Sequence, residues 1–357
     1  MNRFFACAVL CAAAAFGQTT PAAAPAGEVL GPGNFIHVVS NLDNSLAFYH
    51  DVIGMDLQRA GGARGNAAPA PPPPDAPRPF ITTPEILRLY NAVGAQYRVG
   101  AAMVQESPMR AELIEIKDAD RKPVQPRFVD PGASNFILTV KDIGAVMERV
   151  KKSGTPVVTV GGAPVTIDGD RGKMRAVVVK DPDGFFVELV QPETLPDGAA
   201  QSSNNIIDIG FGFTVENTDR MVHVFKDALG FTPQTGSFTS DKARLNLVAA
   251  PAGSQFRKTT ALVPGSSLQV EFLEFKGVDG KPVHSGTHDP GSAVLRLRIR
   301  DMDSMVKSLA ATGVRVVSAD NVPVLVSNAN GGGQRFAITS APDNLFVQVV
   351  QQVQRVQ

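Results

Sequence analysis

The chain has 357 residues, with 34 Lys and Arg against 34 Asp and Glu, so its formal net charge at pH 7 is zero. This balance offers no long-range attraction to nucleic acid or to an anionic membrane surface, so any partner must be recognised by shape and local chemistry. The length exceeds what one hydrophobic core usually organises, which predicts more than one domain.

The N-terminus has the pattern of an export signal. Residues 4–16 are almost wholly apolar, follow an arginine and end among small residues, which predicts a signal peptide over residues 1–17. The run is too short to cross a bilayer as a permanent anchor, and a buried helix is the alternative. Both cysteines, Cys7 and Cys11, lie within it, so the mature chain would contain no thiol. We therefore expect an exported protein, periplasmic or extracellular and free of the membrane after cleavage, with residues 18–32 as a disordered tail.

The first half of the mature chain alternates strands and helices. A strand is expected at 35–39 and a helix between Asn44 and Gly54, because Asn44 or Ser45 can cap its start and glycine favours its end. A second strand and helix are expected at 135–140 and 143–153. The remaining strands are expected at 96–105, 111–117, 175–179 and 185–190. This order contains the unit βαβββ twice and predicts an α+β fold.

Two segments of this half are interpreted as connections. Residues 61–79 are rich in proline and alanine, which predicts an extended, solvent-exposed insertion, and we interpret it as a linker rather than a lid. The acidic turn Asp181-Pro182-Asp183-Gly184 lies between the last two strands. We interpret it as a plain turn rather than a calcium loop.

The second half repeats the first. Residues 109–133 match 268–292 at a constant offset of 159, so that a Lys-Pro pair and an Asp-Pro-Gly motif align. Further matches join 35–55 with 212–231 and 180–192 with 340–352. Helices of the second half are expected near 219–228 and 304–311. We therefore predict two similar domains, at 33–194 and 205–352, joined by a linker at 195–204.

Three segments of the first half, 35–55, 135–158 and 180–192, resemble the vicinal oxygen chelate superfamily. Its members include glyoxalase I, methylmalonyl-CoA epimerase, extradiol dioxygenases and the bleomycin-resistance proteins. The resemblance implies paired βαβββ units that form cup-shaped mixed sheets, here in two tandem glyoxalase-like domains. It also implies a divalent metal in the cup, held by residues of the first and last strands of each unit.

The family template places three metal ligands in the first domain, at His37, Glu112 and Glu188. Glu112 is chosen over Glu115 because side chains alternate between the two faces of a strand. Glu112 shares a face with Ile114 and Ile116, just as Glu188 shares a face with Phe186 and Val190. One imidazole and two carboxylates suit Zn, Ni, Mn or Fe. The fourth position, usually histidine in the family, is Asn135. The resemblance further implies that Glu188 or Glu112 moves a proton during catalysis.

The second half lacks most of this set, and each ligand also has a structural alternative. Phe213, Val294 and Gln348 stand opposite His37, Asn135 and Glu188, so only Glu271 remains. We therefore expect the second domain to be structural or a metal-free pocket. In the first domain, His37 could be a core histidine, Glu112 could form a structural salt bridge, and Arg175 or Lys173 could neutralise Glu188 in place of a metal.

Three functions follow from these observations. The first is an exported, metal-dependent lyase or isomerase that acts on a small substrate with adjacent oxygens. The second is a metal-free protein that binds a small molecule, as resistance-type relatives do. The third is an extradiol-type dioxygenase, which the missing second histidine disfavours.

Overall fold

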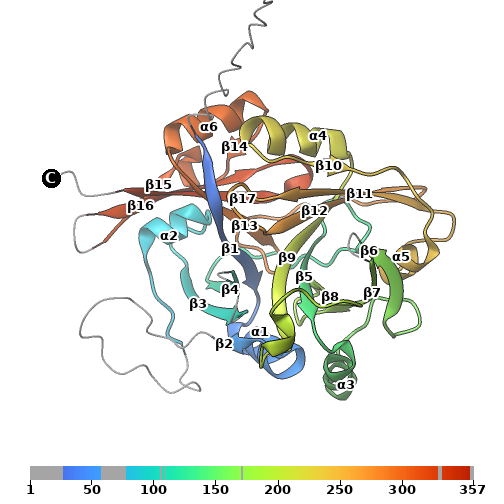
Figure 1. The fold of residues 1–357 in the computed structure, drawn as a ribbon. Helices are drawn as coiled ribbons and strands as arrows, with labels where there is room; N and C mark the ends of the chain where they lie inside the picture. Colours follow the sequence, from blue (N-terminus) through green and yellow to red (C-terminus); the bar gives the residue numbers. More distant parts are fainter. Residues whose placement is uncertain are drawn as a thin grey trace, which may run out of the picture.

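The computed structural model describes residues 27–57, 78–104, 107, 109–169, 172–328 and 332–353 (Figure 1). The predicted signal peptide, most of the predicted tail and most of the Pro-rich insertion lie outside these residues. Among the helices that the structure describes, none is long and apolar enough to cross a membrane.

The fold consists of two curled, mixed sheets with few helices, as the α+β prediction requires. Sheet A has the strand order β14 (Arg315–Val316), β16 (Gly333–Ser340), β17 (Phe346–Val353), β13 (Ala293–Ile299), β1 (Val29–Val39), β4 (Arg110–Lys117), β3 (Gln96–Met103) and β2 (Asp56–Leu57), with β15 (Val324–Ser327) paired to β16. Sheet B has the order β10 (Gln234–Thr235), β11 (Gln255–Leu262), β12 (Gln269–Lys276), β9 (Ile206–Val215), β5 (Ser134–Val140), β8 (Phe186–Pro192), β7 (Gly172–Lys180) and β6 (Val165–Gly169).

Four longer helical segments follow the first strands of the four units. They are α1 (Leu42–Ala47) with the π-helical turn η1 (Phe48–Ile53), α3 (Ile143–Ser153), α4 (Thr218–His223) with η3 (Val224–Ala228), and α6 (Met302–Ala311). Each begins after an Asn or Asp whose side chain accepts a hydrogen bond from the backbone three residues on: Asn41, Asp142, Asn217 and Asp301. The first helix therefore starts earlier than predicted, because Asn41 caps it rather than Asn44 or Ser45.

Each sheet has one face covered by a short helix. The helix α2 (Pro84–Leu89) lies against β15 and β16, and α5 (Lys242–Leu247) lies against β6 and β7. We call the face of sheet A under α2 the sheet A cup, and the face of sheet B under α5 the sheet B cup. The opposite faces of both sheets enclose a shared core, in which the ring of Phe35 lies 5.9 Å from that of Phe136 and 5.3 Å from that of Phe211.

The two halves of the sequence are interleaved in the sheets. The strand β1 of the first unit runs antiparallel to β13 of the fourth, and β5 of the second runs antiparallel to β9 of the third. Each sheet therefore takes one unit from each half. Pairing with β13 also extends β1 back to Val29, inside the segment that we predicted as a tail. A single 3-10 turn, η2 (Ala199–Gln201), lies in the predicted linker.

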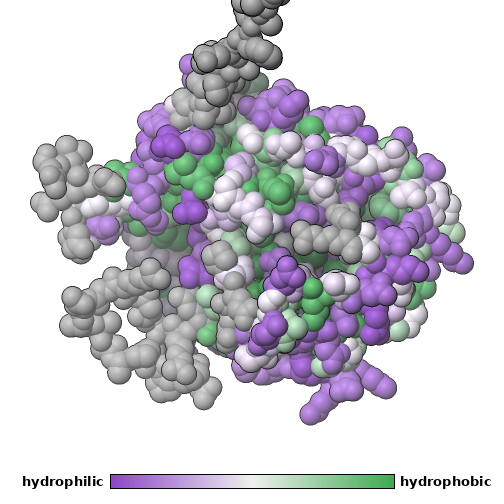
Figure 2. Space-filling model, viewed as in Figure 1, coloured by the Kyte–Doolittle hydropathy of each residue, from purple (hydrophilic) through white to green (hydrophobic). Residues whose placement is uncertain are grey.

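The repeated Lys-Pro and Asp-Pro-Gly motifs hold the halves together. The backbone N–H of Lys122 donates to Asp289 at 2.8 Å, and that of Lys281 donates to Asp130 at 2.9 Å. Both aspartates are buried. Each half therefore gives its carboxylate to the backbone of the other, which explains why both copies keep these motifs. Hydrophilic residues cover most of the face seen in Figure 2, and hydrophobic residues form small separate patches there.

Candidate functional site

The three residues predicted as one metal site, His37, Glu112 and Glu188, lie in three different surroundings. Glu112 is on β4 of sheet A and Glu188 is on β8 of sheet B. Glu112 pairs with Ile36, whereas His37 pairs with Leu113, so His37 points to the opposite face of the same sheet. The structure therefore does not bring these three residues together.

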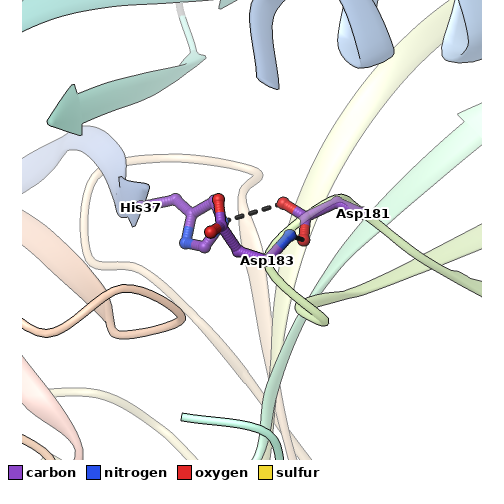
Figure 3. Close-up of side chains that lie close together, drawn as sticks. All are labelled: His37, Asp181 and Asp183. Carbon is purple, nitrogen blue, oxygen red and sulfur yellow. Dashed lines mark hydrogen bonds and ion pairs between the residues drawn. The ribbon is translucent and has the colours of Figure 1, made fainter. Parts of the chain in front are cut away.

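His37 lies in the core between the sheets and is 0% exposed. Its Nε2 donates to Asp181 Oδ2 at 2.8 Å, and its Nδ1 donates to the carbonyl oxygen of Ser292 at 3.2 Å. Figure 3 shows Asp183 beside this pair. Ligand atoms of His37, Asp181 and Asp183 lie within 4.8 Å of one another, so these three side chains could hold a metal ion. We call them the buried triad.

The electrostatics of the buried triad match an ion pair. Burial alone would lower the pKa of His37, but the charges of Asp181 and Asp183 and the hydrogen bonds raise it above the usual value. Both ring nitrogens face oxygen acceptors, so the ring carries a proton on each. Asp181 Oδ1 accepts the backbone N–H groups of Asp183 and Phe185, both at 2.9 Å. The protonated imidazole thus already provides the positive charge that a metal would supply.

In the second half of the chain, apolar residues occupy the positions equivalent to His37 and Asp181 of the buried triad. Phe213, Ala341 and Phe225 occupy the positions of His37, Asp181 and Tyr49, whose hydroxyl donates to Asp181 at 3.3 Å. The second half therefore adopts the same fold without these charged groups.

Glu112 lies in the sheet A cup and is held by an arginine of the second half. Its two carboxylate oxygens accept hydrogen bonds from Nη1 and Nη2 of Arg296, each at 3.0 Å. Asn34 Nδ2 donates to the same carboxylate at 3.0 Å, and the Arg296 Nε donates to Gln348. Burial alone would raise the pKa of Glu112, but Arg296 and Asn34 lower it below its usual value. With both oxygens engaged by a guanidinium, this carboxylate does not fit a metal ligand.

Glu188 lies in the sheet B cup with different neighbours. It is 8% exposed and accepts a hydrogen bond from Asn135 Nδ2 at 3.2 Å. The carboxylate of Glu271, on β12, acts on it electrostatically, as do the opposite charges of Arg244 and Lys258. These two cations, rather than the predicted Arg175 or Lys173, partly neutralise Glu188. Lys258 Nζ itself lies 3.3 Å from Glu271 Oε1.

Glu188 has a strongly perturbed carboxyl group. Burial and then the nearby charge of Glu271 raise its pKa to about 7, while Arg244, Lys258 and the Asn135 hydrogen bond oppose the rise. A buried carboxyl group that titrates near neutral pH can both release and accept a proton at that pH. The sheet B cup therefore holds the group best suited to acid and base chemistry.

The prediction chose His37 as the first-strand ligand, but the residue at that position of the sheet A cup is Asn34. Asn34 contacts Glu112 as Asn135 contacts Glu188, and both asparagines open the same tripeptide, Asn-Phe-Ile. This repeated tripeptide was the available signal. The sequence comparison also missed Arg296, whose position in the first half is held by Ile137.

The choice of Glu112 over Glu115 as the cup residue agrees with the structure. Glu115 faces the other side, where it accepts the N–H of Leu42 at the start of α1 at 2.8 Å and pairs with Arg98 at 2.7 Å. Glu274 does the same for Thr218 and Arg257 in the second half, at 2.8 Å in each case. This pair of glutamates is therefore part of the fold in both copies.

Comparisons with known proteins agree with this architecture. A model of the Glyoxalase/Bleomycin resistance protein/Dioxygenase superfamily matches residues 33–189, and a second model of the same superfamily matches residues 210–330. The structure of glyoxalase I from Zea mays aligns with a TM-score of 0.57 and 14% identity, over 91% of this chain and 92% of that one. A variant of the Zea mays enzyme aligns with a TM-score of 0.55 and 13% identity, over 91% and 94%. A search of curated proteins gave no match.

Proposed function

Because the chain belongs to the Glyoxalase/Bleomycin resistance protein/Dioxygenase superfamily, with two tandem domains of that kind, we propose that it is an enzyme with its active site in the sheet B cup. The proposed chemistry is of the lyase or isomerase type, on a small substrate that bears adjacent oxygens. The observation that carries the proposal is Glu188, a buried carboxyl group whose pKa is raised to about 7.

Four polar residues of the sheet B cup have a role in this proposal: Asn135, Glu188, Lys258 and Glu271. Asn135 fixes one oxygen of Glu188 by donating to Oε2 at 3.2 Å, which leaves Oε1 to take or give a proton. Glu271 keeps the pKa of Glu188 high by its negative charge. Lys258 orients Glu271 through their contact at 3.3 Å. The Glu271 side chain is 18% exposed and so marks the side from which a substrate would enter.

A divalent ion fits the sheet B cup better than the sheet A cup. Glu188 and Glu271 offer carboxylate ligands, and burial and the charge of Glu271 raise the pKa of Glu188, a rise that a bound cation would oppose. When bound, such an ion would polarise a substrate oxygen as a Lewis acid. Gly212 leaves the space that the Asn135 side chain occupies, since a Cβ at residue 212 would come within 2.2 Å of Asn135 Oδ1.

Metal content tests where the ion binds. After loading with Mn²⁺ or Zn²⁺ and gel filtration, the wild-type protein should retain about one ion per chain. Glu188→Gln and Glu271→Gln should lose it, and Glu112→Gln, the matched position in sheet A, should keep it. If the two sheet B variants keep the ion and Asp181→Asn loses it, the ion belongs to the buried triad and the proposal fails.

Proton transfer tests the chemistry. The loaded enzyme should catalyse solvent deuterium exchange next to the carbonyl of small 2-hydroxy ketones, measured by NMR, and Glu188→Gln should abolish the exchange. Export remains part of the proposal, on the basis of the apolar run at residues 4–16.

A further inference from the structure

A separate cavity opens in the sheet A cup. It measures about 720 Å³, a volume within the usual range of small-molecule sites. Its walls come from β1, β13, β16 and β17 and from the connection that carries Ser266. The sheet B residues described above do not line it.

The charge of this cavity has one sign. Four of its lining side chains are arginines, Arg110, Arg296, Arg298 and Arg300, and none of its lining residues is acidic. Arg296 pairs with Glu112 and Arg300 with Glu28, both outside the lining, and the charge of Arg110 also acts on Glu112. Arg298 adds its positive charge to these pairs, and its guanidinium offers forked donors that suit carboxylate or phosphate.

Arg296 is built into the inner end of the cavity. Its stem crosses β1 at Gly33, where a Cβ would come within 2.6 Å of the arginine Cγ, and its guanidinium is fixed by Glu112 and Gln348. It thus lies among the first-strand and last-strand positions of sheet A, where the family resemblance implies a metal. A guanidinium stands in that place instead.

Two buried side chains hold Arg296 at the inner end of the cavity. Tyr90 interacts with both Arg296 and Gln348, and Gln348 accepts from the Arg296 Nε. The outer walls add apolar surface from Leu30, Ile299, Phe336 and Val350.

We propose that the arginine-lined cavity of the sheet A cup binds a small organic carboxylate without a metal ion. The carboxylate faces Arg296 and Arg298, and the apolar body lies against Phe336 and Val350. Arg298 is exposed, and among the described residues its Nε donates to the carbonyl oxygen of Pro32 at 3.1 Å while its Nη atoms make no hydrogen bond, so the Nη atoms can face the ligand. This site is independent of the proposed enzyme site in sheet B.

The test uses a panel of small monocarboxylates, such as phenylacetate, each paired with its neutral primary amide, such as phenylacetamide. Binding is measured by ligand-observed NMR on protein that has been stripped of metal with EDTA and then freed of EDTA, which is itself a carboxylate, with inorganic phosphate as the competing oxyanion. Acids from the panel should bind and their amides should not. Arg298→Gln should weaken acid binding at least tenfold and Arg298→Glu should abolish it.

Two controls keep this result separate from the enzyme site. Arg175→Gln removes an exposed arginine on β7 of sheet B, and Glu188→Gln removes the proposed proton-transfer group. Both should leave acid binding unchanged. The proposal is overturned if no acid binds, if Arg298→Gln and Arg175→Gln have equal effects, if removal of metal abolishes binding, or if phosphate alone binds.

Discussion

Replacing Glu188 with glutamine should make the metal-free protein more stable, by an amount that grows with pH. The folded protein raises the pKa of Glu188 from an ordinary 4.5 to about 7. The stability contributed by the protonated group is therefore complete below about pH 4.5 and is lost as pH rises to about 7. At 1.36 kcal/mol per tenfold change in proton affinity, the loss is about 3 kcal/mol. Glutamine mimics the protonated form at every pH and avoids the loss.

Chemical denaturation measures this effect. The protein has no Trp, so unfolding is best followed by circular dichroism in urea, with EDTA present, at pH 5, 6, 7 and 8. The advantage of Glu188→Gln should rise across this series and level off above pH 7. Glu112→Gln is the matched control with the opposite sign, because Arg296 lowers the pKa of Glu112. It should destabilise by a constant amount over the series, about 3–5 kcal/mol for a broken buried pair. A pH-independent effect of Glu188→Gln would refute the reasoning.

Three further predictions concern other contacts. His37→Phe alone should lower the free energy of unfolding by about 3–5 kcal/mol, because it leaves Asp181 buried without its partner. The double variant His37→Phe, Asp181→Ala copies Phe213 and Ala341 of the second half and should recover at least about 1 kcal/mol. Additive losses of the two substitutions in chemical denaturation would contradict this. Gly212→Ala should displace Asn135 and raise the pKa of Glu188 further, because the hydrogen bond that lowers it is lost; an unchanged carboxyl titration by ¹³C NMR would argue against the contact. Asp130→Ala and Asp289→Ala should each cost about 1–3 kcal/mol by leaving the N–H of Lys281 or Lys122 without its acceptor, and a loss for only one of them would contradict the reciprocal arrangement.

Local sequence patterns were sufficient for the elements and for the repeat. Apolar spacing and terminal glycines marked the helices, although the cap of the first helix is Asn41 rather than Asn44 or Ser45, and the repeated motifs marked the halves. The strand alternation that separated Glu112 from Glu115 was also informative, because side chains two residues apart share a face. These features depend on neighbours within one segment, so they can be recognised without knowing the rest of the fold.

The arrangement of the site could not be obtained in the same way. Which unit pairs with which depends on contacts between residues far apart in the chain, such as β1 with β13, and no local pattern reports them. His37 is three residues from Asn34, an odd number, so the choice of the wrong residue moved the predicted ligand to the opposite face of the strand. Arg296 acts on Glu112 only because the fourth unit completes sheet A.

The interleaving of the halves has a consequence for how the two cups could diverge. If one half existed as a separate polypeptide, two copies would have to exchange units to complete both sheets, and symmetry would then give both cups the same residues. Joining the halves in one chain makes the assembly independent of dilution and encodes each cup only once. A guanidinium can then enter one cup through the fourth unit while the other keeps its pair of acids, so a single folded molecule can host two unlike chemistries.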